Sequence, residues 1–485
     1  MQKDNVNFKI LLLGILFFGL FGWAKSSLGA EYYVTPDGAG SKTGTNWANA
    51  YDKTFTPVRG NTYYLAGGSY GPLTLSTAAS GSTLITIKKA TALDHVTDIG
   101  WQASYGTDVA VFTQVIFPTS YWVFDGVTGG GSESWTTGHG IEVYTNGLSE
   151  PLFIDDNVTD ISIKHVNAHV YPDETSKSNL VNFLSVLKAT LGGSARLTFD
   201  YDYFHDAFGC MFHLAAVDNM TVTNSYFFNN KSTPAWHSGG VCNLNGGNNA
   251  IFKDNIWKNI EGSAIFDLIG VAGGSAYIAD NWLIQDQIIW QDNAQKIING
   301  VYPIAVWNDS SNNTTATNWK VYNNTIVNIA GENTFLFAVT GTNNEVKNNL
   351  FFCNRGSDTA DHNYYVPPSV LHSYNHMYDC SGHNIFGTPG TGESSFYYDA
   401  ASGLYLSQYK TNPFVDWPNG DFRLKSCSAG MDCPVGAGID LGSSFNTDII
   451  GTARPQGSAW DIGAYEYGQG GDTTPPGAPT GLSVR

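Results

Sequence analysis

The chain has 485 residues, a formal net charge of −18, and a composition that is 42% hydrophobic and 14% aromatic. This length suits about three ordinary domains, unless the chain consists of repeats, whose length grows by adding units. The acidic excess argues against nucleic acid as a partner, because such a field repels polyanions.

The N-terminus has the order of residues that is typical of a secretory signal peptide. Lys3 and Lys9 precede an apolar run from Ile10 to Phe21, and small residues follow up to Ala30. A retained membrane anchor would need about 18 or more apolar residues, and this run is shorter. We therefore predict that residues 1–30 are a cleaved signal. The protein is then secreted or held at the cell surface, and it does not insert in a membrane after cleavage.

Six cysteines follow the predicted signal, an even number in a chain bound for an oxidising compartment. We expect them to form disulfides, since no C-x-x-C spacing points to a metal. The close pair Cys427 and Cys433 is the firmest prediction. Proximity in the sequence suggests the other two pairs, Cys210 with Cys242 and Cys353 with Cys380.

One short pattern recurs through the middle of the chain. It consists of an apolar residue, a spacer, a small polar residue that is often Asn or Asp, a second polar residue, and then further apolar residues. The intervals between copies run from 23 residues (199 to 222) to 43 residues (278 to 321), which is typical of solenoid repeats. Eight copies begin at Val123, Ile163, Phe199, Val222, Phe252, Ile278, Val321 and Val346.

The copies alternate in hydrophobicity rather than following a helical period. In seven of them an apolar or aromatic residue also stands two places earlier, and a period of two predicts strands. A single coil of short strands cannot bury its own apolar face, so we expect neighbouring coils to stack and share one elongated core. The seven residues are Tyr121, Ile161, Leu197, Met220, Ala250, Ala276 and Trp319.

The polar pair within each copy is interpreted as structural. Asn tolerates left-handed backbone angles at corners, and its amide can bond to the next coil. We therefore expect a ladder at one corner of the coils rather than a ligand site. The first positions are Asp254, Asp280, Asn323 and Asn348, and the second positions are Asn255, Asn281, Asn324 and Asn349.

Stretches at both ends of the chain resemble the secreted bacterial right-handed parallel β-helix proteins, which have the pectate-lyase-like fold. Glu31–Ser41 and Asn46–Ala50 look like the entry strand and cap of that family, and Tyr121–Gly129 looks like its first full coil. Four later stretches resemble the final coils and closing cap of that family, namely Asn412–Asp416, Asp421–Leu424, Gly436–Gly442 and Asp461–Tyr467. The resemblance implies an all-β chain that forms a single-stranded right-handed parallel β-helix solenoid with N- and C-terminal caps.

These observations give an expected domain organisation. The tail from Thr473 to Arg485 looks like the approach to a fibronectin type III module, although its Pro and Gly content also suits a plain linker. The expected parts are a signal peptide (1–30), an N-terminal cap with the first coils (31–120), the β-helix core (121–390), terminal coils with a closing cap (391–467), and a flexible linker or truncated fibronectin type III start (468–485).

The resemblance implies a polysaccharide lyase, a glycoside hydrolase or a non-catalytic adhesin, because the fold alone does not decide. A lyase acting on a uronate needs a cation, often Ca²⁺, and a Lys or Arg as base. The sequence contains no ladder of carboxylates followed by Arg, so it does not identify a cofactor. Calcium stays an open alternative. Fragments of the polygalacturonase pattern occur in the wrong order at Gly138–Gly140, Asp155–Asp156 and Asn446–Asp448, and we interpret them as chance matches.

The strongest local candidate lies on the second strand of consecutive coils. If Phe212 and Leu214 point inward, alternation turns His213 outward. The same reasoning with Cys242 and Leu244 inward turns Asn243 outward, and with Ala264, Phe266 and Leu268 inward it turns Asp267 outward. We predict His213 and Asp267 as a catalytic acid–base pair and Asn243 as a substrate ligand. A register shift of one residue would bury all three.

Further candidates for sugar binding are Trp236, His237 and Trp307, which stand in loop-like stretches, with His205 and Asp206 extending the site. Exposed aromatics are suited to stacking on sugars, but these side chains could instead pack loops onto the coils. We expect a monomer that binds, and as an enzyme cleaves, an extracellular polysaccharide or cell-surface glycan. The alternatives are a non-catalytic adhesin-like β-helix and a purely structural extracellular module.

Overall fold

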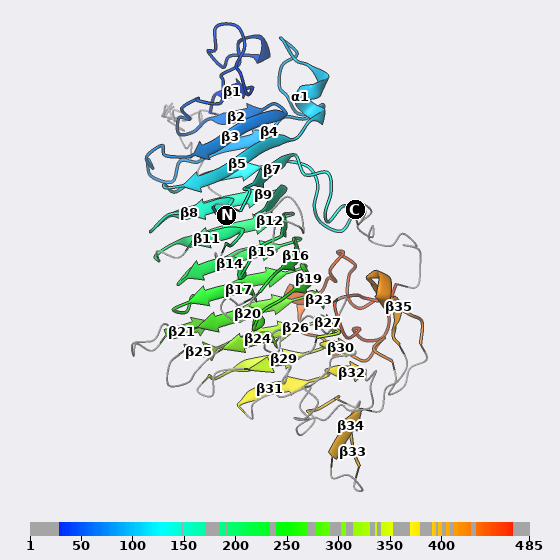
Figure 1. The fold of residues 1–485 in the computed structure, drawn as a ribbon. Helices are drawn as coiled ribbons and strands as arrows, with labels where there is room; N and C mark the ends of the chain where they lie inside the picture. Colours follow the sequence, from blue (N-terminus) through cyan, green and yellow to red (C-terminus); the bar gives the residue numbers. More distant parts are fainter. Residues whose placement is uncertain are drawn as a thin grey trace, which may run out of the picture.

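A computed structural model gives the fold of the chain (Figure 1). It describes residues 29–147, 149–170, 184–189, 192–232, 239–269, 277–291, 302–306, 314–329, 335–336, 341–352, 369–378, 390–393, 396–399, 404–407, 412–427 and 433–468. Residues 1–28 of the predicted signal peptide and the tail beyond residue 468 lie outside these residues.

Three ladders of parallel strands run along the molecule, and we call them ladders A, B and C. Ladder A contains β1 (Glu31–Val34), β2 (Thr62–Leu65), β4 (Ile85–Lys89), β6 (Trp122–Asp125), β9 (Thr159–Lys164), β12 (Ala195–Asp200), β15 (Thr221–Thr223), β18 (Ile251–Lys253), β22 (Leu283–Gln285), β26 (Lys320–Tyr322), β29 (Asn344–Lys347) and β31 (Val370–Ser373).

Ladders B and C begin in two shared strands, β3 (Gly68–Thr74) and β5 (Ala110–Phe117), which pair from Gly68 with Ala110 to Thr74 with Ile116. The ladders separate after β5, which pairs with β7 near its start and with β8 near its end. Ladder B continues through β7 (Ile141–Tyr144), β10 (Val166–His169), β13 (Tyr203–His205), β16 (Tyr226–Asn230), β19 (Ile256–Ile260), β23 (Ile288–Trp290), β27 (Thr325–Val327), β30 (Leu350–Phe352) and β32 (His376–Tyr378). Ladder C continues through β8 (Leu152–Ile154), β11 (Leu187–Ala189), β14 (Cys210–Ala215), β17 (Gly239–Leu244), β20 (Ala264–Ile269), β24 (Tyr302–Val306) and β28 (Phe335–Leu336).

Outside the ladders the structure describes only short elements. Helical turns are α1 (Ala103–Thr107) and three 3₁₀ segments, Trp47–Asn49, Trp417–Asn419 and Ser443–Phe445. Three further strand pairs are β21 (Tyr277–Asp280) with β25 (Thr314–Thr317), β33 (Phe396–Asp399) with β34 (Leu404–Ser407), and β35 (Phe414–Asp416) with β36 (Asp421–Leu424). Within the described residues no helix has the length and apolar character needed to cross a membrane.

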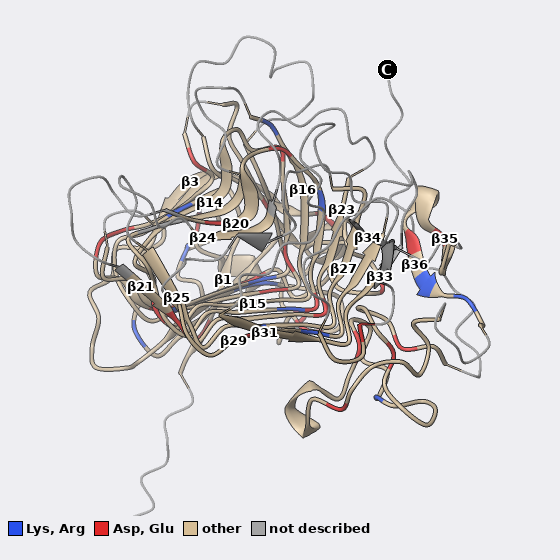
Figure 2. Ribbon diagram, turned by 90° about the horizontal axis from the view of Figure 1, so that it is seen from below, with Lys and Arg blue, Asp and Glu red and all other residues tan. Residues whose placement is uncertain are grey.

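The chain visits ladders A, B and C in turn, for example in β12, β13 and β14, and then begins the next coil in β15. Crossovers between parallel strands are right-handed as a rule, and the result is a right-handed parallel β-helix, as predicted. The end view shows the ladders as walls around one interior (Figure 2). That interior is filled by inward-facing apolar side chains of all three ladders, which form one continuous core.

The register confirms six of the eight predicted repeat copies and corrects two. Ile163, which starts the second copy, pairs with Phe124 rather than with Val123. The first copy therefore begins at Phe124, one residue later than predicted. The sixth copy belongs at Ile284, which pairs with Phe252, rather than at Ile278. Ile278 lies on β21, which pairs with β25 at another corner of the coil. The residues Asp280 and Asn281 follow Ile278 at the same spacing as the polar pair of the repeat, and the sequence analysis therefore took this stretch for a copy.

The predicted corner ladder is present at three of its four rungs. Asp254, Asn323 and Asn348 have left-handed φ angles of 58°, 55° and 57°. The residues after them are fully or almost fully buried and bond from coil to coil, as where Asn349 Oδ1 accepts from the Asn324 backbone N at 2.9 Å. The prediction was wrong for Asp280, which is the last residue of β21, and for Asn281, which follows it at the surface. Asn281 Nδ2 donates there to Asn249 Oδ1 at 3.0 Å, in a separate exposed ladder.

Two of the three predicted disulfides are confirmed. Cys210 on β14 is bonded to Cys242 on β17, and Cys427 is bonded to Cys433. The first bond ties consecutive coils of ladder C together. The third predicted pair, Cys353 with Cys380, lies outside the described residues.

Residues 412–427 and 433–467, which we call the C-terminal segment, pack on the outer face of ladder B (Figures 1 and 2). The contact is apolar, and it extends over several coils. From the segment it contains Phe414, Phe422, Leu424, Ile449, Ile462, Ala464 and Tyr465, and from ladder B it contains Tyr226, Ile256, Ile288, Trp290, Val327, Leu350 and Phe352.

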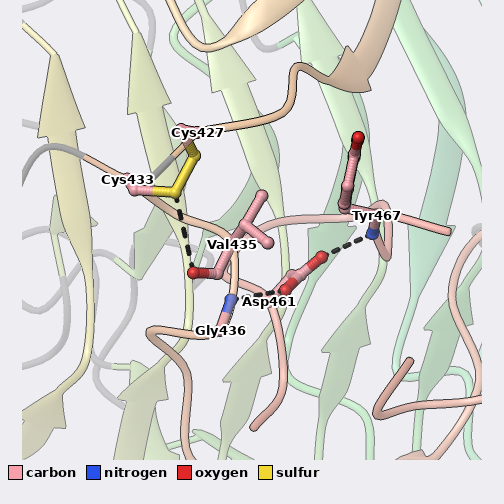
Figure 3. Close-up of a disulfide and its surroundings, with 6 residues drawn as sticks. All are labelled: Cys427, Cys433, Val435, Gly436, Asp461 and Tyr467. Carbon is pink, nitrogen blue, oxygen red and sulfur yellow. Dashed lines mark hydrogen bonds between the residues drawn. A yellow bond between two sulfur atoms is a disulfide. The ribbon is translucent and has the colours of Figure 1, made fainter. Parts of the chain in front are cut away.

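Hydrogen bonds fix the turns of this segment. Asp461 accepts from the backbone N atoms of Gly436 and Tyr467, close to the Cys427–Cys433 disulfide (Figure 3). Arg454 is buried and joins the segment to the coils, with Nη2 3.2 Å from Asp286 Oδ1 and Nη1 3.0 Å from Glu466 Oε2. The segment is therefore anchored by both apolar packing and a buried ionic group.

Candidate functional site

The predicted catalytic face on ladder C differs from its expected arrangement. His213 pairs with Cys242, and Cys242 pairs with Asp267, so these three positions form one row on the ladder. Asn243 instead aligns with Leu214 and Leu268, which both belong to the core. The expectation that Asn243 shares a row with His213 and Asp267 was wrong. On β17 Val241 faces the core. Because neighbouring residues of a strand face opposite sides, Cys242 faces outward.

His213 and Asp267 remain on the same row but are not adjacent. They stand two strands apart, roughly 10 Å at the spacing of parallel strands, and the disulfide-bonded Cys242 lies between them. His213 is half-buried, and burial together with the charge of Lys188 lowers its pKa to about 4. Asp267 is only 1% exposed. This geometry does not assemble a direct acid–base pair.

Three of the predicted sugar-binding residues, Trp236, His237 and Trp307, lie outside the described residues. His205 and Asp206 are described, and they belong to a polar cluster on the outer face of ladder B. We call Glu142, Asn167, His169, His205 and Asp206 the histidine cluster.

Strand alternation and register bring the cluster together. On β7, β10 and β13 the residues Val143, Ala168 and Phe204 face the core, so that the residues on either side of them face outward. The outward positions then align across strands in two rows. Glu142, Asn167 and Tyr203 form one row, and Tyr144, His169 and His205 form the other.

Each histidine of the cluster is held by a carboxylate. His169 Nε2 lies 3.0 Å from Glu142 Oε1, and His205 Nδ1 lies 2.8 Å from Asp206 Oδ2. His205 Nε2 lies 2.9 Å from Asn167 Oδ1. Asn229 Nδ2 also donates to Asp206, which fixes that carboxylate from the next coil. The outcome is two imidazole–carboxylate pairs on neighbouring strands.

Aromatic rings stack along the same face. The ring centroids of His169 and His205 are 4.3 Å apart with an interplanar angle of 13°, and Tyr144 stacks on His169 at 5.3 Å. Tyr203 stacks on His205 at 4.2 Å. Together these contacts fix the orientation of both imidazole rings.

The cluster is partly accessible to solvent. The side chain of Glu142 is 30% exposed, while those of His205 and Asp206 are each 13% exposed and that of His169 is 8% exposed. The hydrogen bond from His169 is the largest influence on Glu142 and lowers its pKa below the ordinary value. An ionised, accessible carboxylate therefore stands beside an imidazole, which is an arrangement that can accept and return a proton.

A second segment borders the cluster on the side of ladder A. His165 Nδ1 lies 2.7 Å from the carbonyl oxygen of Gly129, and His139 Nε2 lies 3.2 Å from that of Tyr201. Burial lowers the pKa of His139 to about 4. These contacts hold the residues between β6 and β7 against the corner of ladders A and B.

The part of the chain that the structure describes contains no group of three or more His, Cys, Asp or Glu side chains placed to hold a metal ion. The question of a cofactor, calcium included, stays open.

Sequence reasoning found His205 and Asp206 but missed Glu142, Asn167 and His169. A signal was available one strand after each corner, where Ile141–Tyr144, Val166–His169 and Tyr203–His205 each alternate between apolar and polar or aromatic residues. Extending the repeat by that strand would have placed the outward residues in rows.

No family model matches the sequence, and no curated protein matches it. Among solved structures, the chain is similar to pectate lyase Pel9A, with 13% identity, a TM-score of 0.46, and coverage of 90% of this chain and 96% of that one. It is similar to the PL6 family polysaccharide lyase Pedsa3628 from Pseudopedobacter saltans, with 12% identity, a TM-score of 0.36, and the same coverage.

The surface adhesin PfbA of Streptococcus pneumoniae is also similar, with 11% identity, a TM-score of 0.23, and coverage of 73% of this chain and 91% of that one. At these levels of identity and TM-score the similarities do not decide between a catalytic and a non-catalytic protein. The fold stands on the strand register described above.

Proposed function

We propose that this protein is an exported β-helix that binds an extracellular polysaccharide and cleaves it at the histidine cluster, as a lyase or a glycoside hydrolase. One observation carries the proposal, namely the two imidazole–carboxylate pairs fixed side by side on a partly exposed sheet face. Two disulfides fit export, because such bonds persist in oxidising compartments.

The roles within the cluster follow from exposure. Glu142 and His169 are the acid–base pair, since Glu142 is the most accessible carboxylate of the cluster and its pKa is held low. Asp206 and Asn167 position His205, which in turn stacks on His169. Tyr144 offers a ring beside the pair on which a sugar can stack.

A second candidate function is a non-catalytic, adhesin-like glycan-binding protein. It is favoured by the fact that both ring nitrogens of His205 already lie within hydrogen-bonding distance of protein oxygens. An imidazole held on both sides is well suited to building a rigid binding surface. In that case the cluster binds sugar and releases no product.

The experiment is a screen of plant, algal and bacterial polysaccharides for new reducing ends and for unsaturated products, followed by Glu142→Gln and His169→Ala on the cleaved polymer. We expect each variant to lose about 10²- to 10⁴-fold in rate, the usual contribution of general acid–base groups. The acidic limb of the pH–rate profile should lie below the ordinary glutamate range, because Glu142 must stay ionised.

The matched control is His213→Ala, which removes another half-buried imidazole from an outer face, but on ladder C. Unchanged activity is expected for this variant. If His213→Ala or Asp267→Asn abolishes cleavage while His169→Ala does not, the reaction belongs to ladder C instead. Retention on one polysaccharide without any product would select the adhesin-like function.

A further inference from the structure

The C-terminal segment meets the coils at a contact that is rich in carboxylates. On the coils the contact includes Asp254 and Asp286, which stand at equivalent corner positions after β18 and β22 and have left-handed φ angles of 58° and 51°. The segment contributes the buried carboxylates of Asp448, Asp461 and Glu466. We call these five residues the acidic contact.

Within the described residues, two cations are paired with the acidic contact. Arg454 Nη2 lies 3.2 Å from Asp286 Oδ1, and Arg454 Nη1 lies 3.0 Å from Glu466 Oε2. Lys253 Nζ lies 3.7 Å from Asp254 Oδ2. If every group were ionised, five negative charges would therefore face two positive ones where burial has removed most of the water, which is costly.

Asp254 is the member of the acidic contact whose carboxylate is held by the fewest hydrogen bonds. Its Oδ1 atom is buried and has no hydrogen-bond donor within the described structure. By contrast, Asp448 Oδ1 accepts from the backbone N of Thr452 at 2.7 Å, and Asp461 Oδ1 accepts from that of Gly436 at 2.6 Å. A buried carboxylate oxygen without a donor disfavours the ionised form of Asp254.

The charges around Asp254 come from both the coils and the C-terminal segment. Burial is the largest influence on Asp254 and raises its pKa to about 7. The charge of Lys253 opposes this effect, that of Asp448 adds to it, and that of Arg454 opposes it again. Tyr201, at the same corner two coils earlier, also interacts with Asp254. Asp254 is therefore a carboxyl group whose protonation depends on the docked segment.

Docking of the segment changes the proton affinity of Asp254. When the segment is released, water returns to the carboxyl group and its pKa falls towards the ordinary value of about 4. Because the pKa is higher in the docked state, the contribution of Asp254 to docking is fully present below about pH 4. It is lost as the pH rises through about 7. Asp286 acts in the same direction, since burial raises its pKa as well.

We propose that the acidic contact is a pH-sensitive switch, in which the C-terminal segment stays docked while Asp254 carries a proton and loosens when Asp254 ionises. Loosening uncovers residues of ladder B such as Ile256 and Ile288, which are only 7% and 1% exposed and pack in one apolar cluster with the segment. These residues continue the row of Glu142. The switch therefore controls how many coils of ladder B are open to solvent.

Hydrogen exchange of the full-length protein measures this switch without any substrate. Protection factors, which remove the intrinsic pH dependence of exchange, are determined for peptides from residues 433–467 between pH 5 and pH 8. In the wild type we expect this protection to fall by up to about tenfold for each pH unit between pH 5 and pH 7, the limit for one proton. The core strands β12 and β15 should keep their protection.

Asp254→Asn is the variant that isolates the switch, because an amide cannot ionise. Asn suits this corner, since Asn224, Asn323 and Asn348 have left-handed φ angles at the equivalent positions. We expect the segment of Asp254→Asn to keep its protection from pH 5 to pH 8. The matched control is Asp156→Asn, at an exposed position, which should show the pH dependence of the wild type.

Lys253→Met is a second variant. It removes a cation that favours the ionised form of Asp254, so the loss of protection should move to higher pH. The switch is overturned by a wild-type segment whose protection is independent of pH, or by an Asp254→Asn segment that follows the wild-type profile. A parallel loss of protection in β12 and β15 would also overturn it, because the whole protein would then be unfolding.

Discussion

At the scale of single residues, Asp202 occupies a position that is unfavourable for a carboxylate. It is fully buried at the corner of ladders A and B, and its two oxygens accept from the backbone N atoms of Val166 and Asp200 at 2.8 and 3.1 Å. Burial raises its pKa well above the ordinary value, despite those two bonds. In the next two coils the equivalent acceptors are the neutral side chains of Ser225 and Asn255, which accept from the backbone N atoms of Asp202 and Ser225.

This difference predicts a pH-dependent effect of Asp202→Asn. Because the folded-state pKa is raised, the carboxyl contributes its full stability below its unfolded pKa of about 4, and that stability is lost as the pH rises towards the folded value. An amide cannot ionise, so the melting temperature of Asp202→Asn relative to wild type should increase between pH 4.5 and pH 8.

Thermal unfolding of both proteins across this range is the measurement. The control is Asp156→Asn, at an exposed position, for which we expect a constant difference in melting temperature. A difference for Asp202→Asn that stays flat from pH 4.5 to pH 8 would show that the Asp202 carboxyl is equally stable in its charged form.

Residue-scale errors of the sequence analysis have a common cause. Cys242 was assigned to the core by alternation, whereas Val241 takes the inward position and Cys242, which is bonded to Cys210, stands in the row of His213 and Asp267. Alternation defines two faces but does not say which one is inside when both carry small or apolar residues. The row of His213 and Asp267 could be inferred, but the position of Asn243 could not.

At the scale of elements, the C-terminal segment depends on Arg454. The guanidinium is fully buried and contacts Asp286 and Glu466 as well as the carbonyl oxygens of Asp461 and Gly463. Removing one partner from a buried ionic group leaves an uncompensated charge, which typically costs about 3–5 kcal/mol. We therefore expect Arg454→Met to loosen the segment and expose the apolar outer face of ladder B.

Limited proteolysis and urea unfolding test this prediction, with faster cleavage between residues 412 and 467 as the expected result. Arg423→Met is the control, because the Arg423–Asp421 pair is partly exposed and such pairs contribute about 1 kcal/mol or less. Equal effects of the two substitutions would contradict an anchoring role for Arg454.

The elements also show which parts of the fold a sequence can predict. Strands such as β12, β15 and β18 could be predicted because apolar residues alternate there between Asn-rich corners. The packing of the C-terminal segment could not, since Ile449, Ile462 and Tyr465 lie outside regular strands, and the ladder B residues of the same cluster stand between 97 (Phe352 to Ile449) and 239 residues (Tyr226 to Tyr465) earlier in the chain.

The histidine cluster was predicted only in part for a related reason. Glu142 and His169 are 27 residues apart and become neighbours only through the pairing of β7 with β10. Insertions of different lengths between coils make this register visible only when the repeat is extended to the second strand of each coil. His205 and Asp206 could be recognised without that step because they are adjacent in the chain, whereas Asn167 required it.

At the scale of the whole molecule, one long core supports three outer faces with different surroundings. The later coils of ladder B are covered by the C-terminal segment, and its early coils carry the histidine cluster. Ladder C carries the row of Lys188, His213 and Asp267. The net charge of −18 favours neutral polymers over polyanions unless local cations compensate.

The most direct test of the proposed site is a crystal structure of Asp206→Asn with an oligosaccharide of the polymer that the protein binds. The account predicts sugar density on the outer face of ladder B, stacked on Tyr144 and in contact with Glu142 and His169. Density confined to the row of His213 and Asp267 on ladder C, with the histidine cluster unoccupied, would contradict it.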